Sequence, residues 1–139
     1  MTDAAKEKLA ALCAKGNAEK VRKAPVTAVL GMDLNFVAHL LRLFPHTDAR
    51  GWYGDNQKLI EKSAFRNSSI QGGDFIIAAR MLGLDTNLMS GFDEEAVNAA
   101  FFASTTVRVN FIATLGYGDP ATLYPRAPRL SFEEANRVA

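Results

Sequence analysis

Residues 63–93 read SAFRNSSIQGGDFIIAARMLGLDTNLMSGFD, and this stretch decides how the rest of the chain is arranged. Its first two thirds repeat apolar and small residues at three- and four-residue steps, which predicts one long helix that ends at Gly83. Residues 75–79 (FIIAA) are apolar throughout, so this helix must be covered on most of its faces. Gly72 and Gly73 each cost a helix about 1 kcal/mol relative to Ala. This cost favours close approach of a second helix over a simple kink.

The segment after this helix is predicted to be a short loop over residues 84–91. It is followed by a second helix that Asp93 caps, with two acidic residues in its first turn. A loop held between two ordered helices can present backbone groups to a flat ligand. Residues 84–91 are therefore the first place at which we expect a binding function.

Composition describes an ordinary globular domain. The 139 residues are 48% hydrophobic and 22% charged, enough for one domain with a real core. A net charge of +1 argues against a nucleic-acid partner, and no apolar run approaches the roughly 18 residues that span a bilayer. The start lacks a secretory signal pattern, so we expect a cytoplasmic protein without a membrane partner. Cys13 is the only cysteine, and its place on an apolar helix side favours a buried, inert thiol over a nucleophile.

Two segments have the apolar, β-branched character of strands, residues 25–32 (PVTAVLGM) and 107–115 (VRVNFIATL). Helices are expected over residues 4–15, where Gly16 would end the helix, over 35–44, and after a capping box at 131–134. Residues 17–23 form either a second short helix or a continuing turn. Two strands do not make an independent sheet, so the chain is short of strands for the helices it holds.

Residues 45–57 (PHTDARGWYGDNQ) form a long polar and aromatic loop. A loop of this length is either a lid or binding loop or an irregular surface segment. If it binds, His46, Arg50 and Trp52 are the candidate substrate contacts.

Several chemistries lack the residues that they need. The two histidines, His39 and His46, are separated by a proline and lie far from Cys13, so neither a metal site nor a Cys-His pair is expected. The chain has no phosphate-binding loop, no G-x-S-x-G elbow and no G-x-G-x-x-G after a strand. No side chain is therefore assigned as catalytic, and any chemistry should be carried by a bound cofactor.

Four segments, taken in order, resemble the nitroreductase-like flavoprotein family, and most of all its malonic semialdehyde reductase branch. They are GNAEK before APV at residues 16–26, the central helix, GLD through MSGFD at residues 83–93, and LGYGD leading to PRLSFEE at residues 115–134. LFPHTDARGWY and FRNSSIQ resemble the same branch. The similarity covers essentially the whole chain. It implies FMN bound at a homodimer interface and hydride transfer from NAD(P)H through the flavin to a small-molecule substrate.

The resemblance also implies which residues hold the cofactor. Asn17 and Lys20 match positions that face the flavin ring and ribityl oxygens, where a cation favours negative charge on the reduced ring. Without the resemblance, Asn17 would be read as a helix cap and Lys20 as a solvated surface lysine. The segment that lies over the ring and the basic pair near the phosphate correspond to Leu88, Met89, Ser90, Gly91, Arg126 and Arg129.

Family members have roughly a quarter more sequence ahead of Asp3, which carries part of their phosphate site. We therefore expect a single nitroreductase-like domain over residues 1–139 that is N-terminally truncated relative to the family. The expected fold is α+β, a small mixed or antiparallel sheet flanked by helices, with the long central helix at a homodimer interface. The expected function is reduction of a small aldehyde, a nitro compound or a quinone. The alternative is a flavin-free module of this fold that acts only as a structural or dimerisation partner, which the missing front segment and the strand shortage favour.

Overall fold

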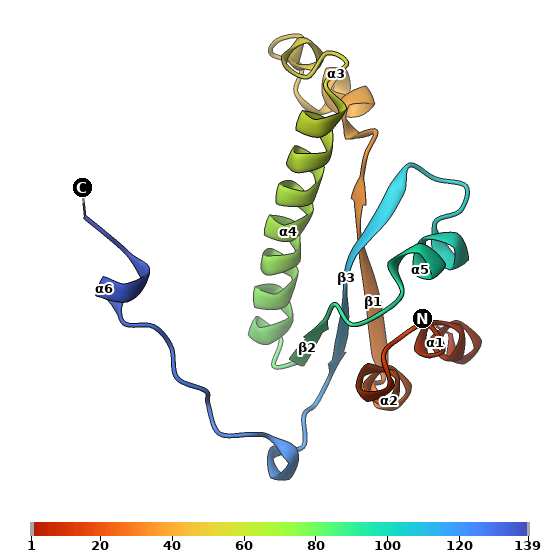
Figure 1. Ribbon diagram of the computed structural model, residues 1–139, viewed down its shortest axis with the longest axis vertical. Helices are drawn as coiled ribbons and strands as arrows, with labels where there is room; N and C mark the ends of the chain where they lie inside the picture. The colour runs from red at the N-terminus through yellow and green to blue at the C-terminus, as the bar shows by residue number, and fades with distance from the viewer. Residues whose placement is uncertain (1, 139) are drawn as a thin grey trace.

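A three-stranded antiparallel sheet forms the middle layer of the protein, shown in Figure 1. The computed structural model describes residues 2–138. The strands are β1 (Val26–Asp33), β2 (Asp85–Met89) and β3 (Val107–Gly116), in the spatial order β1-β3-β2. β3 therefore pairs with both other strands. Val26 lies opposite Leu115, and a bulge between Leu30 and Gly31 shifts the register towards the far end of β1.

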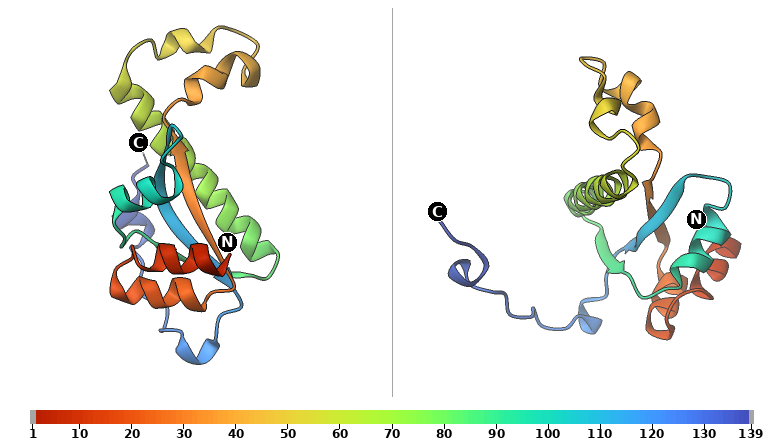
Figure 2. Two further views of the ribbon diagram at one scale, coloured as in Figure 1. Left: turned by 90° about the vertical axis from the view of Figure 1, so that its right-hand side faces the viewer. Right: turned by 45° about the horizontal axis from the view of Figure 1, so that its top comes forward.

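Helices cover both faces of this sheet. In chain order the helices are α1 (Asp3–Ala10), α2 (Lys15–Lys23), α3 (Leu40–Leu43), α4 (Gln57–Met81), α5 (Glu94–Phe101) and α6 (Phe132–Ala135), with 3-10 turns η1 (Phe36–His39), η2 (Ala49–Trp52) and η3 (Pro120–Thr122). The two views of Figure 2 place α1, α2 and α5 on one face of the sheet and α4 on the other. The expected α+β fold, a small antiparallel sheet flanked by helices, is confirmed.

The main core lies between the sheet and the α1, α2 and α5 layer. Its buried residues are Leu9, Ala10, Ala18, Val21, Met89, Val97, Val109 and Ile112. Each buried aliphatic side chain contributes about 1.5–3 kcal/mol through removal of apolar surface from water. This core fixes α2 and the end of β2 against the same strand, β3.

α4 packs on the opposite face through its smallest residues. Ser68 Oγ donates to the Gly31 carbonyl at 3.0 Å, and Asn110 Nδ2 donates to Ser68 Oγ at 3.1 Å. A Cβ at Gly72 would lie 2.4 Å from the Phe111 ring, so Gly72 makes room for that ring. The expectation that a second helix explains Gly72 is therefore wrong, because within the chain the close neighbour is the sheet. A Cβ at Gly73 would meet no atom within 4 Å.

The two ends of α4 have clear local causes. Asn56 caps its start, where its side chain accepts from the Leu59 N–H at 3.1 Å. At the other end Gly83 has φ of 78°, and its N–H donates to the Arg80 carbonyl at 3.0 Å. The Leu84 N–H donates to the Ala79 carbonyl, also at 3.0 Å, which completes a Schellman motif. Gly83 ends the helix as predicted.

Three local predictions were wrong. Residues 84–91 are not simply a loop, because β2 occupies residues 85–89 and supplies the third strand; the strand shortage does not exist. The first helix stops at Ala10, and Gly16 lies in the first turn of α2 instead of ending α1. Residues 35–44 form η1 and the single turn α3 instead of one helix.

Residues 117–138, here called the arm, leave the sheet after β3 and run away from the other elements (Figure 1). Every residue of the arm is exposed, including Leu123, Tyr124 and Phe132. Its short helix α6 nevertheless has the predicted capping box: Ser131 and Glu134 each accept from the other's backbone N–H. Within residues 2–138 the arm thus has local structure, and its hydrogen bond to the rest of the chain lies at its base, where the Gly118 N–H donates to Asp85.

The Gly72–Phe111 contact gives a first prediction. In Gly72→Ala the added methyl overlaps the Phe111 ring, so the ring or the helix must shift, and the free energy of unfolding should fall by about 1–3 kcal/mol. Gly16→Ala is the control, because a Cβ there meets nothing within 4 Å and Ala favours the helix by up to about 1 kcal/mol. Urea unfolding of both variants measures the difference. Equal stabilities would show that Phe111 does not need the space above Gly72.

Candidate functional site

The start of α2 and the loop after β2 are joined by several hydrogen bonds. The Gly91 carbonyl accepts from the Ala14 N–H at 2.9 Å and from Asn17 Nδ2 at 3.1 Å. The Asp93 N–H donates to the Leu12 carbonyl at 2.8 Å, and an antiparallel bridge joins Cys13 to Phe92. Residues 90–93, here called the Gly91 loop, are therefore held against the segment that links α1 to α2.

Cys13 has no reactive environment in this arrangement. Its side chain packs against the core, and burial raises the pKa of its thiol above the ordinary value. A raised pKa keeps the group as the neutral thiol, which is the poor nucleophile. This agrees with the interpretation of Cys13 as an inert packing residue.

The Gly91 loop leaves two backbone donors free. Within residues 2–138, neither the Ser90 N–H nor the Gly91 N–H donates a hydrogen bond to another residue, and both residues are exposed. β2 ends at Met89, so these two amides lie just beyond the last paired residue of the strand. Two adjacent free N–H groups can bind the acceptor atoms at the edge of a flat ligand.

The side chains of the predicted ring-covering segment point to different places. Met89 is buried in the core, so only its backbone can face a ligand. Leu88, which precedes it on the strand, is half exposed on the other face of the sheet. Of the four predicted residues, Ser90 and Gly91 are the ones that lie beside Asn17.

An open cavity of about 510 Å³ lies at the end of the sheet where β2 begins, whereas the Gly91 loop follows the other end of that strand. This volume is within the range of small-molecule and cofactor sites. Its lining comes from the C-terminal half of α2, the ends of β2 and β3, and the base of the arm: Lys20, Lys23, Ala24, Pro25, Asp85, Thr86, Asn87, Thr114, Leu115, Gly116, Tyr117, Gly118, Thr122, Leu123 and Tyr124. Lys20 is thus the predicted cofactor residue that lines a cavity.

The part of the sheet that borders this cavity has polar groups without partners among residues 2–138. Thr27, Thr114 and Asn87 lie opposite one another across β1, β3 and β2, so they form one row on the sheet. Thr27 Oγ1 and Asn87 Nδ2 are both buried, and neither has a hydrogen-bond partner in the part of the chain that the structure describes. Buried polar atoms normally find a partner, so this end of the sheet has unused hydrogen-bonding capacity.

Asp85 holds the base of the arm at the rim of the cavity. Its carboxylate accepts from the Gly118 N–H at 2.7 Å and from the Arg80 guanidinium. The Gly118 N–H and, after it, the Arg80 guanidinium hold the pKa of the Asp85 carboxyl below its ordinary value. Sequence reasoning missed Asp85 and Asn87, although their period-two spacing would have placed both on one strand face once β2 was recognised.

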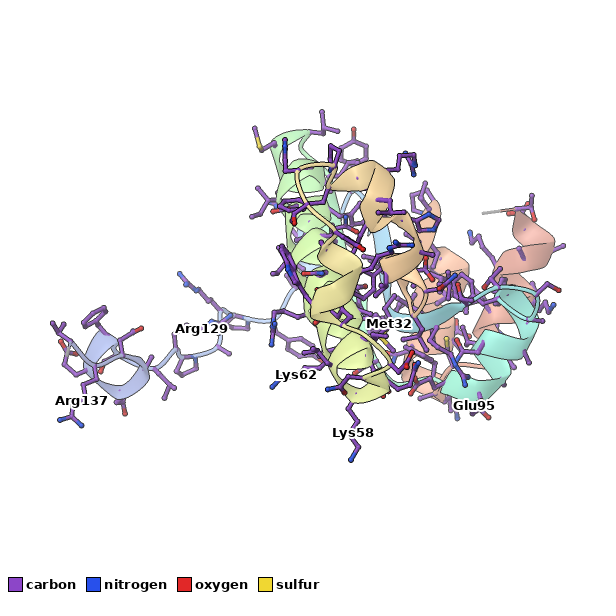
Figure 3. All side chains as sticks on the ribbon, turned by 90° about the horizontal axis from the view of Figure 1, so that it is seen from above. Met32, Lys58, Lys62, Glu95, Arg129 and Arg137 are labelled. Atoms are coloured by element: carbon purple, nitrogen blue, oxygen red, sulfur yellow. The ribbon has the colours of Figure 1, made fainter. Side chains whose placement is uncertain are left out.

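The two arginines predicted to hold a phosphate are elsewhere. Arg126 and Arg129 belong to the arm, and Arg129 Nη1 donates to the Ala127 carbonyl at 2.8 Å. Figure 3 shows Arg129 on the arm, apart from α4 and the sheet. In a single copy of the chain they are not brought together with Lys20.

The candidate substrate residues lie at the other end of α4. His46, Arg50 and Trp52 belong to the segment that precedes this helix, whereas β2 follows it (Figure 1). A helix of 25 residues spans roughly 37 Å, so the two ends cannot form one small site within one chain. Phe44 packs edge-on against His46 and Trp52, with ring centroids 5.6 Å apart in each pair, and Arg50 pairs with Asp48.

Metal ligands and membrane-spanning helices also bear on the class of site. Within residues 2–138, no group of three or more His, Cys, Asp or Glu side chains is placed to hold a metal ion. In the same part of the chain, no helix is long and apolar enough to cross a membrane.

Comparison with known proteins identifies the class. Residues 2–117 match the Nitroreductase family. A protein of Burkholderia lata named as a candidate NADH dehydrogenase/NAD(P)H nitroreductase is 55% identical over 134 residues, which are 96% of this chain and 69% of that protein. A similarly named protein of Stenotrophomonas maltophilia is 54% identical over 135 residues, 97% of this chain and 69% of its own length. The chain belongs to the nitroreductase family.

Solved structures give the same fold at low sequence identity. A nitroreductase family protein from Streptococcus pneumoniae has a TM-score of 0.82 at 21% identity, covering 99% of this chain and 76% of that one. A nitroreductase from Exiguobacterium sibiricum, solved in complex with FMN, has a TM-score of 0.83 at 17% identity, covering 99% of this chain and 73% of its own. These likenesses establish the nitroreductase fold for this chain.

The Asp85 anchor gives a prediction with a defined pH dependence. Because the folded pKa of Asp85 is lowered, the anchor is fully present above the ordinary carboxyl pKa of about 4 and is lost as the pH falls through the lower, folded value. Asp85→Ala should lower the hydrogen-exchange protection of the Gly118 amide several-fold at neutral pH. Asp119→Ala is the control, because that carboxylate accepts from the Ala121 N–H instead. Unchanged protection of Gly118 in Asp85→Ala would contradict the anchor.

Proposed function

We propose that this protein is an FMN-dependent oxidoreductase that uses NAD(P)H to reduce a small organic substrate. Membership of the nitroreductase family and relatives named for NAD(P)H nitroreductase activity support the reaction class. The observation that carries the proposal for this chain is that one helix, α2, is bonded to the Gly91 loop through Asn17 and lines the cavity with Lys20, one turn further along. Bound FMN would take a hydride from NAD(P)H and pass it to the second substrate.

The residues present suit a flavin. A flavin ring is flat and has acceptor atoms along one edge, which the free N–H groups of Ser90 and Gly91 match. Lys20 supplies a cation on the cavity side, and a cation near the ring favours the negative charge that reduction adds. The unpaired Asn87 Nδ2 gives a further donor beneath the cavity. This chain's residues therefore bind, orient and polarise, and none is proposed to exchange a proton with the substrate.

Within this reaction class we favour a small aldehyde such as malonic semialdehyde as the substrate, with nitro compounds and quinones as alternatives. The support is the resemblance of the LFPHTDARGWY and FRNSSIQ segments to the malonic semialdehyde reductase branch. The aromatic group of Phe44, His46 and Trp52 is a compact surface that could close over a small substrate. Turnover with each substrate class, with NADH and with NADPH, would rank the choices.

The cofactor proposal gives a test on Lys20. Wild-type protein incubated with FMN should retain the visible absorption of bound flavin after gel filtration. Lys20→Ala should raise the FMN dissociation constant by roughly ten- to a hundredfold, as expected for loss of a charged contact. It should also make the midpoint potential of the bound flavin more negative, because the favourable charge is lost.

Lys62→Ala is the control for that test, since Lys62 projects from α4 on the other side of the sheet, as Figure 3 shows. Wild-type protein that stays colourless after FMN treatment would contradict the proposed function. It would support the alternative of a flavin-free structural module instead. The shortage of strands is no longer an argument for that alternative, because the sheet has three strands.

We further infer that two copies associate through α4. The face of α4 away from the sheet has Ile70, Ile77 and Met81 at 58%, 61% and 82% exposure. Spacings of seven and four residues place the three in one stripe, with the open Gly73 beside them. A contiguous apolar stripe on a small protein is typical of an interface, and a twofold pairing of the same surface is the commonest form.

A twofold axis perpendicular to α4 accounts for the scattered site residues. It makes the paired helices antiparallel, so the segment holding His46, Arg50 and Trp52 in one copy lies near the Gly91 loop of the other. The arm has exposed Leu123, Tyr124, Leu130 and Phe132, and within residues 2–138 its hydrogen bond to the rest of the chain is the one at its base, from the Gly118 N–H to Asp85. We propose that it packs on the second copy and carries Arg126 and Arg129 to that copy's phosphate site, where forked guanidinium groups suit phosphate oxygens.

The association gives its own prediction. Ile77→Glu places a charge in the proposed interface and should raise the dimer dissociation constant roughly tenfold or more. Lys58→Glu introduces the same residue near the start of the same helix, where Figure 3 shows the side chain directed away from the protein, and should leave the dimer intact. Light scattering coupled to gel filtration measures both. A monomeric wild-type protein, or a dimer unaffected by Ile77→Glu, would contradict the interface.

A further inference from the structure

The Gly91 carbonyl is the atom through which the start of α2 is hydrogen-bonded to the Gly91 loop, whose amides are proposed to bind the flavin. This one oxygen accepts two hydrogen bonds, from the Ala14 N–H and from Asn17 Nδ2. The first bond comes from the backbone that precedes α2, so it exists whatever the side chains are. The second depends on the identity of residue 17, which lies in the first turn of α2.

Gly91 and Asn17 also fit each other by shape. A Cβ built on Gly91 would lie 2.7 Å from Asn17 Nδ2, which is closer than real Cβ contacts. It would lie 3.6 Å from the Ala14 Cβ, which is an ordinary van der Waals distance. The backbone of Gly91 does not have the positive φ that other residues avoid. Glycine is therefore needed at position 91 for the Asn17 amide and not for the backbone conformation.

The pairing has a consequence for the groups that face outward. Fixing the Gly91 carbonyl fixes the plane of the Gly91–Phe92 peptide and, through it, the direction of the loop. The N–H groups of Ser90 and Gly91 remain unpaired and exposed on that fixed loop. Donors that are already oriented bind an acceptor without the entropy cost of ordering the loop first.

We propose that Asn17 is a positioning residue, which acts on the cofactor through Gly91 by holding the Ser90 and Gly91 amides in their binding orientation. This inference rests on the proposed flavin function. It assigns Asn17 an indirect role, in contrast to a side chain whose amide contacts the flavin itself. The difference between the two roles is measurable, because an indirect role disappears once the Gly91 contact is already broken.

A double-mutant cycle separates the two roles. Asn17→Ala removes the donor to Gly91. Gly91→Ala displaces the flexible end of Asn17 and breaks the same bond, while the Ala14 bond stays. Each single variant should raise the FMN dissociation constant by about three- to tenfold, the worth of one hydrogen bond. The double variant should be no worse than either single one, because both changes remove one and the same interaction.

Two further measurements complete the test. In the protein without flavin, hydrogen exchange at Ser90 and Gly91 should rise several-fold in Asn17→Ala and in Gly91→Ala. In the flavin-loaded protein both variants should shift the midpoint potential in the same direction and by the same amount, which a change in overall stability would not do. Lys15→Ala, an exposed residue of the same helical turn, should leave all three readouts unchanged.

The outcomes are distinct. If the effects of Asn17→Ala and Gly91→Ala on FMN binding multiply in the double variant, Asn17 contacts the flavin directly and the positioning role is wrong. If Asn17→Ala changes neither FMN binding nor loop exchange, the role is also wrong. If wild-type protein binds no FMN, the proposed function fails, while the exchange data on the flavin-free protein still decide whether Asn17 holds the loop.

Discussion

The pairing of β3 with both other strands is the constraint on which the rest of the structure depends. β1 and β2 do not pair with each other, and within the sheet each is hydrogen-bonded to β3. Because Leu115 of β3 lies opposite Val26 on one side and Thr86 on the other, the start of β1 and the start of β2 meet at one end of the sheet. α2 runs into β1 and the arm leaves β3 at that same end. The cavity beside Lys20 is therefore a direct product of strand register.

The two faces of this sheet are packed in different ways, and the difference has consequences for function. On the α1, α2 and α5 face, large aliphatic side chains fill a conventional core, which holds the Gly91 loop and α2 in fixed relation. On the α4 face, Gly72 and Ser68 allow close contact with the sheet, so α4 directs its larger apolar residues outward. A helix that uses its small residues inward and its large ones outward is suited to packing between two partners, the sheet on one side and a second chain on the other.

Much of the fold could be predicted from sequence because its signals are local. Periodicity located α4, Gly83 marked its end through a left-handed turn, and β-branched runs located β1 and β3. β2 was missed because DTNLM has little intrinsic strand preference and forms only through pairing with β3. Gly72 was assigned to the wrong neighbour for a similar reason. The sequence indicates that something approaches closely, but not that it is the ring of Phe111, 39 positions further along the chain.

The candidate site shows the same division between local and long-range information. Lys20, Ser90 and Gly91 are predicted from the family resemblance, yet the bond between Asn17 and Gly91 joins residues 74 positions apart and has no sequence signal of its own. Asn87 and Asp85 were missed because their strand was missed. Arg126 and Arg129 lie on the arm, and His46, Arg50 and Trp52 lie at the far end of α4, so this arrangement of a single chain does not gather them around Lys20. In one chain the hydrogen-bond donors lie beyond one end of the long helix α4, the aromatic residues lie at its other end, and the arginines lie on the exposed arm. Two copies related by a twofold axis would bring these parts together into one site.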